Sequence, residues 1–289
     1  MKIPLRQNLQ AYFFLAPALV LFAVFSFWPV GYGSYLAFTD YSLIKPVHWV
    51  GLDNFRTIFD NDMFVTGLRN SLLFLLIVPV IQIGALALAV LTNNSLPGIR
   101  LFRVAFYVPV VTTISVVGIM WGFMFHEQGT LNYVLLQLRA INQPVGWLTD
   151  DSIALFSVMF VTIWRGLGWY MVMYLAGLQA IPAEMQEAAI LDGATRWQRF
   201  WKITVPMLRP TILVCSIMSI LAALKAYQEV LVLTQGGPLN ATFTALYYAY
   251  DQGLKHLKLP RGLAASLVVS VCCIGIMLPF LRYFKPRHR

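Results

Sequence analysis

The chain has 289 residues, of which 59% are hydrophobic and 11% charged, and its formal net charge at pH 7 is +9. A soluble domain averages about 25% charged residues, so the composition excludes an ordinary soluble protein and indicates a membrane protein. We attribute the basic excess to membrane topology and not to nucleic-acid binding, because Lys and Arg are enriched in the cytoplasmic loops of membrane proteins.

The first apolar run occupies residues 12–36, after two basic residues near the N-terminus. A signal peptide has an apolar region of only about 7–15 residues, whereas a helix needs about 20 residues to cross a bilayer. We therefore expect a retained membrane-spanning helix here and not a cleaved signal.

Further apolar runs follow, and together they predict an all-α integral membrane protein with about six spans in a single transmembrane domain, residues 1–289. Lipid offers no partner for free backbone groups, so each span must be helical. The loops are too short for a separate soluble domain. The spans are expected at residues 12–36, 70–91, 104–125, 153–178, 211–233 and 263–281.

The distribution of basic residues predicts that both ends of the chain are cytoplasmic. With this orientation, twelve Lys and Arg residues fall on inside segments and seven on outside segments. Basic residues favour the cytoplasmic side, so the excess supports an N-in and C-in topology.

The sequence shows no pattern for covalent chemistry. The three cysteines, Cys215, Cys272 and Cys273, lie in apolar runs, where buried thiols are expected. No nucleotide-binding G-x-x-x-x-G-K-[ST] loop, metal-ligand spacing or G-x-S-x-G elbow occurs in the sequence. We expect no enzyme activity, cofactor or metal in this chain, so any transport energy must come from a partner or an ion gradient.

A polar segment, residues 181–210, separates the fourth and fifth predicted spans. Pro182 suits a first helical turn, and an apolar stripe follows at helical spacing through Ile190, Ala194, Trp197 and Trp201. The spacing leaves two interpretations open: a helix lying on the lipid surface, or a helix docked into a cytoplasmic partner. The side on which the two tryptophans act is also left open.

Three charged residues fall within the predicted spans: Arg165, Lys225 and Glu229. Ionisable groups in a membrane usually face a bundle interior or a wet cavity. Lys225 and Glu229, spaced i, i+4 on one expected helix face, either pair with each other or line a solute path. Arg165 lies in the stretch WRGLGWY, whose glycines either permit close helix packing or break the helix beside a cavity.

The polar segment also carries a family resemblance. Glu187-Ala188-Ala189, Asp192-Gly193-Ala194 and Ile203-x-Val205-Pro206 resemble the EAA loop of ABC-transporter permeases, with Val205 in place of the usual leucine. The stretches VGLDNFRTIFD, GLQAIPAEMQEAAILDGA and LTQGGPLNATFTALYYAY are similar to permeases for sugars and glycerol phosphate. Nearly the whole chain resembles this maltose-permease-like superfamily.

The resemblance implies a multi-pass subunit of the bacterial cytoplasmic (inner) membrane that forms half of the pathway of an ATP-driven importer. It also implies a second homologous permease, two ATPase subunits that bind ATP and Mg, and an extracytoplasmic substrate-binding protein. The resemblance implies a sugar, oligosaccharide, polyol or related solute. Two unbalanced cations in the spans would suit an anionic solute such as a sugar phosphate, but Glu229 offsets one of them, so a neutral sugar or polyol is expected. The alternative from the residues is a stand-alone, ion-coupled secondary transporter.

The resemblance implies two groups of site residues. The expected contacts with the ATPase, in a cytoplasmic coupling helix, are Glu187, Ala188, Ala189, Asp192, Gly193, Ala194, Arg196, Ile203 and Pro206. The expected solute contacts, on the spans that flank the loop, are Arg165, Trp169, Ser219, Lys225 and Glu229. Stacking of Trp169 and Tyr170 on a sugar face and ordinary packing of these rings are both open.

Overall fold

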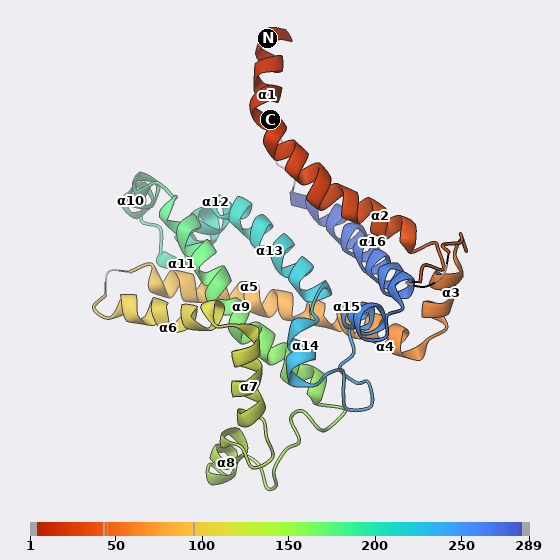
Figure 1. Ribbon diagram of the computed structural model, residues 1–289. Helices are drawn as coiled ribbons and strands as arrows, with labels where there is room; N and C mark the ends of the chain where they lie inside the picture. The colour runs from red at the N-terminus through yellow and green to blue at the C-terminus, as the bar shows by residue number, and fades with distance from the viewer. Residues whose placement is uncertain (1–4, 43, 45, 95, 285–289) are drawn as a thin grey trace. The chain divides into compact units, whose positions relative to one another are not determined.

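The computed structural model describes residues 5–42, 44, 46–94 and 96–284 (Figure 1). Over these residues the regular structure is helical, apart from one isolated antiparallel bridge between Thr39 and Trp49. The chain divides into two compact units: residues 1–61 with 249–268, and residues 62–248 with 269–289. The expected all-α class is confirmed.

By length and composition, four helices are able to cross a membrane, or up to six if each of two bent pairs is one span. This agrees with the prediction of about six spans. The unbent candidates are Phe13–Leu36, Asp62–Thr92, Ala154–Gln179 and Leu259–Pro279, and the bent pairs are Ile99–Val111 with Ile114–Met124, and Arg196–Met207 with Arg209–Leu224.

The first unit contains the N-terminal span and a group of aromatic side chains that contact one another. Its helical elements are α1 (Leu5–Phe22), η1 (Ala23–Phe27), α2 (Trp28–Leu36), α3 (Asp53–Phe59), η4 (Asp251–Lys255) and the first part of α16 (Leu259–Phe284). The π-helical turn η1 stands directly before Pro29, where a wider turn accommodates a residue that lacks an N–H.

An asparagine holds the loop after α2. The Asn54 side chain donates to the carbonyls of Ala37 and Thr39, both at 2.8 Å. Aromatic rings then continue from α2 through Phe38, which stacks on Trp49 with centroids 5.4 Å apart. The loop after the first span is therefore fixed by hydrogen bonds and ring contacts within this unit.

The second unit holds the remaining spans. Its helical elements are α4 (Asp62–Leu73), η2 (Phe74–Leu76), α5 (Ile77–Thr92), α6 (Ile99–Val111), α7 (Ile114–Met124), α8 (Thr130–Gln137), α9 (Ala154–Gln179), α10 (Ala183–Leu191), α11 (Arg196–Arg199), η3 (Phe200–Thr204), α12 (Val205–Met207), α13 (Arg209–Leu224), α14 (Gln228–Leu233) and α15 (Ala245–Tyr250), of which the last reaches the unit boundary.

Helix α9 is the centre of this unit and packs against α5, α6, α13 and α14. Its glycines allow the close approach: a Cβ on Gly166 would lie 3.1 Å from Ile81 of α5, and one on Gly168 would overlap the Phe106 carbonyl of α6. Because α9 runs unbroken through both positions, close packing is the role of these glycines, and the expected alternative of a helix break is wrong.

The third predicted span, residues 104–125, is not one helix. Helices α6 and α7 meet at a bend of 102°, where Thr112 and Thr113 both have extended backbone. The Thr112 hydroxyl donates to the Val108 carbonyl at 2.8 Å. Such side-chain hydrogen bonds compete with the backbone hydrogen bonds of a helix. A pattern of apolar residues does not reveal this competition, so the bend was not predicted.

The fifth predicted span, residues 211–233, is also interrupted. Helix α13 ends at Leu224 and α14 begins at Gln228, so Lys225 and Glu229 do not share one helix face as expected. The Ala226 carbonyl at the break accepts from the Thr244 hydroxyl at 2.6 Å. A residue far along the chain therefore supplies the partner that a continued helix would have provided.

Candidate functional site

The charged residues of the spans form a different pair from the one expected. Arg165 Nη1 on α9 lies 3.0 Å from Glu229 Oε1 on α14, with the two side chains 25% and 13% exposed. The prediction that Lys225 pairs with Glu229 is therefore wrong, because the break between α13 and α14 turns Glu229 toward α9. The ion pair joins two helices at a point where a lone charge would cost about 2.5–3.5 kcal/mol on insertion scales.

Lys225 stands apart from this pair. It caps the C-terminus of α13, its backbone N–H donates to Leu221 and Ala223, and its side chain is exposed. Among the residues that the structure describes, no carboxylate makes a salt bridge with it.

Ser219 lies in a buried polar network between three helices. Its hydroxyl accepts from the Gln82 side chain of α5 at 2.8 Å and donates to the Ser216 carbonyl at 3.0 Å. The Tyr174 hydroxyl of α9 donates to the other end of the Gln82 amide. This network ties α5, α9 and α13 together. A direct solute contact by Ser219 stays a prediction.

The neighbouring rings on α9 face different surroundings. Trp169 is 42% exposed, whereas Tyr170 is only 6% exposed and belongs to the core. Trp169 is thus the ring available for contact with a solute or another subunit, and Tyr170 packs inside the bundle.

The polar segment forms a helix–turn–helix whose surface is largely exposed. Helix α10 ends at a turn in which Gly193 has φ +75°, the Gly193 N–H donates to Ile190, and the Ala194 N–H donates to Ala189. These bonds define a Schellman motif, which requires a left-handed residue where the glycine stands. The motif explains the glycine of the EAA pattern: no atom lies within 4 Å of a Cβ built on Gly193, so the backbone and not packing selects it.

The second arm of this segment begins with a capping box that the sequence analysis missed. The Thr195 hydroxyl accepts from the Gln198 N–H, and the Gln198 side chain accepts from the Thr195 N–H. The spacing Thr-x-x-Gln was the available signal. A hydrogen bond of 3.2 Å from Gln186 to Thr204 holds the two arms together.

The segment exposes apolar side chains instead of burying them. Leu191, at the end of α10, is 88% exposed, Ile190 is 54% exposed and Met185 is 48% exposed. Trp197 and Trp201, 70% and 52% exposed, contact each other edge to face. Of the expected coupling residues, Ala189 is buried, Ala194 and Ile203 are half-buried, and the others are exposed.

Two further asparagines, not singled out from the sequence, organise the loops. Asn132 of α8 is 1% exposed; its amide donates to the carbonyls of Glu127 and Val145, and its oxygen accepts from Val145 N–H and Trp147 Nε1. Asn70 of α4 donates to the carbonyls of Ala241 and Phe243, both at 2.8 Å. These asparagines fix the 126–147 loop and the end of the glycine-rich 234–244 turn.

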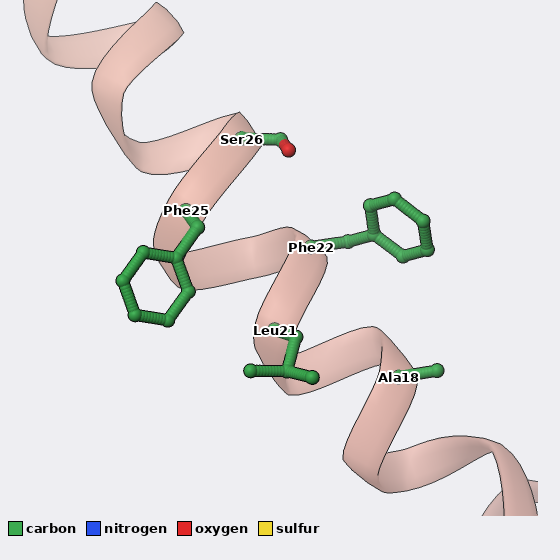
Figure 2. Close-up of a pocket in the computed structure, with 5 residues that line it drawn as sticks. All are labelled: Ala18, Leu21, Phe22, Phe25 and Ser26. Carbon is green, nitrogen blue, oxygen red and sulfur yellow. The ribbon is translucent and has the colours of Figure 1, made fainter.

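Two largely apolar cavities are lined by none of Arg165, Lys225 and Glu229. One, of about 300 Å³, is lined by Ala18, Leu21, Phe22, Phe25 and Ser26 of α1 and η1 (Figure 2). The other, of about 430 Å³, is lined by residues of α4 and η2, among them Arg69. Each is lined by one continuous helical stretch, so each is a shallow groove along a helix and not an enclosed binding pocket.

Helices long and apolar enough to cross a membrane, charged side chains within the bundle and an exposed helix–turn–helix are the features of a multi-pass membrane transport subunit. The family described as "Binding-protein-dependent transport system inner membrane component" matches residues 7–289, and the chain belongs to this family. It is therefore the permease component of a binding-protein-dependent ABC importer, and the alternative of a stand-alone secondary transporter finds no support.

Relatives of known name cover nearly the whole chain. The lactose transport system permease protein LacF of Rhizobium radiobacter is 32% identical, over 98% of this chain and 95% of its own length. The sulfoquinovosyl glycerol transport system permease protein SmoG of Agrobacterium fabrum is 31% identical, over 97% and 92%. Among solved structures, a chain of a bacterial ABC transporter that imports the acidic polysaccharide alginate matches with a TM-score of 0.84 and 23% identity, covering 98% of both chains.

Proposed function

We propose that this chain forms half of the translocation pathway of an ATP-driven importer for a sugar or sugar derivative in a bacterial inner membrane. A second, homologous permease forms the other half, two ATPase subunits bind ATP and Mg, and an extracytoplasmic binding protein delivers the solute. Closure of the ATPase dimer then switches the pathway between an inward-open and an outward-open state. The switch requires that the partner subunits bind one of these two states more tightly than the other.

The observation that carries this proposal is the exposed helix–turn–helix of residues 182–207. Its internal bonds hold α10 in a fixed position without burying the helix, while Ile190 and Leu191 present apolar surface. A helix that is held in position but not buried, and that exposes apolar side chains, suits insertion into a groove of a partner protein. We assign Glu187, Asp192, Gly193 and the other predicted coupling residues to the ATPase contact on this basis.

Replacement of Leu191 by Asp tests the assignment. Leu191 is 88% exposed, so the change removes little packing within the chain. We expect the ATPase subunits to be lost from the purified complex while the chain remains inserted. The matched control is Leu239→Asp, at an equally exposed leucine (89%) in the turn after α14, which should retain the ATPase. Retention of the ATPase by Leu191→Asp would contradict the docking assignment.

Gly193→Asp provides a second test at the turn. A side chain at φ +75° meets no neighbour within this chain, so the helix–turn–helix should form at a cost of about 1 kcal/mol. We expect loss of solute uptake and of solute-stimulated ATP hydrolysis, because the new carboxylate stands at the ATPase contact. Normal stimulated hydrolysis in this variant would remove Gly193 from the coupling surface.

The relatives' names support a carbohydrate-type solute. Lactose and sulfoquinovosyl glycerol, named for two relatives, are both glycosides, although they differ in size and charge. A thermal-shift screen of the cognate binding protein against sugars, polyols and their derivatives tests the class. Binding only of amino acids or peptides would contradict it.

A further inference from the structure

The predicted spans contain three charged side chains, Arg165, Lys225 and Glu229, so their sum is one positive charge. The structure assigns the single carboxylate to Arg165, at 3.0 Å, and that carboxylate is only 13% exposed. Lys225 is thereby left as the uncompensated cation of these three. From the sequence, Glu229 was expected to offset one of the two cations, Arg165 and Lys225, and a neutral solute was expected on that ground.

The local geometry keeps the Lys225 ammonium available. The residue stands at the break between α13 and α14, where its neighbour Ala226 is buried and bonded to Thr244 while the Lys225 side chain is exposed. The break therefore holds the backbone in place and presents the amine. Among the described residues, no carboxylate forms a salt bridge with this amine.

We infer that the solute carried by this importer bears an anionic group, such as a carboxylate, phosphate or sulfonate, and that Lys225 pairs with this group during passage. The inference rests on the proposed function and deepens it by fixing the charge class of the solute. Lys225 directly follows a candidate membrane span that ends at Leu224. A cation at such a position without a counter-ion is costly, and a transient anionic ligand lowers that cost only while it is bound. A lysine ammonium acts as a point charge and suits an anion that must also leave.

The test uses the complete transporter, purified with its partner subunits and reconstituted in proteoliposomes with its binding protein. First, the binding protein is screened by thermal shift with matched pairs: glucose and glucuronate, glycerol and sn-glycerol 3-phosphate, lactose and lactobionate. ATP-driven uptake of the ligands that bind is then measured for the parent and for Lys225→Met, Lys225→Arg and Lys258→Met. Lys258, an exposed lysine before α16, is the matched control for removal of one positive charge.

We expect uptake of the anionic member of a pair, a fall of about tenfold to a hundredfold in its rate for Lys225→Met, and recovery in Lys225→Arg, with Lys258→Met unchanged. Efficient uptake of a neutral solute would overturn the inference and leave the proposed function intact. Unchanged uptake by Lys225→Met would do the same. If the Lys225→Met transporter fails to assemble while the Lys225→Arg transporter assembles, the counter-ion of Lys225 is an acidic residue of another subunit. That outcome would also overturn the inference of an anionic solute. Absence of ATP-driven uptake for every ligand that binds would instead refute the proposed function.

Discussion

The ion pair between Arg165 and Glu229 should couple α9 to α14 strongly. We consider three variants: Arg165→Met, Glu229→Leu and the double change. At a separation of 3.0 Å, Coulomb attraction at an effective dielectric constant of about 20 is about 5.5 kcal/mol before any desolvation. Each single change leaves one charge in the bundle without its partner, which typically costs about 3–5 kcal/mol for a buried pair.

Solvent lowers these figures, because the Arg165 side chain is 25% exposed. We therefore expect each single variant to lose about 2–4 kcal/mol of unfolding free energy, and the double variant to lose less than either. Apolar residues of similar size replace both charges in the double variant, so no unpaired charge remains. The coupling energy of the cycle should then be about 2 kcal/mol or more.

The assay is denaturant-induced unfolding of the purified chain in detergent micelles, followed by circular dichroism. Additive effects, in which the double variant loses the sum of the two single losses, would refute the reasoning. They would mean that the two residues stabilise the bundle independently and that the salt bridge contributes nothing.

Two further predictions concern α4 and the loop that surrounds α8. Gly67→Val should destabilise the chain by about 1–3 kcal/mol, since a Cβ there would lie 2.9 Å from the Thr244 carbonyl carbon. Gly122→Val, with no atom within 4 Å of the new Cβ, is the control, and equal thermal stability of both variants would contradict the prediction. Asn132→Asp keeps the acceptor for the 145–147 segment but loses the amide donor, so it should cost about 1–3 kcal/mol and speed hydrogen exchange in the 126–147 loop. Unchanged exchange relative to the exposed control Asn142→Asp would show that the side-chain network does not hold the loop.

The sequence by itself determined the class of this protein. Hydropathy predicts about six helical spans because a bilayer imposes helices of a fixed minimum length, and the described residues hold four helices able to cross a membrane, or six if each bent pair is one span. The EAA pattern singled out the polar segment, residues 181–210, from the sequence alone. The glycine of this pattern has a physical reason, because a helix that ends in a left-handed turn needs a glycine there. Gly193 occupies such a turn.

Only the tertiary structure decided which charges meet. The i, i+4 spacing of Lys225 and Glu229 predicted a pair on one helix, but Thr244 takes up the Ala226 carbonyl and the helix stops between them. The carboxylate then pairs with Arg165, 64 residues away, and no carboxylate among the described residues forms a salt bridge with Lys225. Local periodicity cannot reveal such a contact, since the hydrogen-bond donor at the helix break is Thr244, outside the periodic segment.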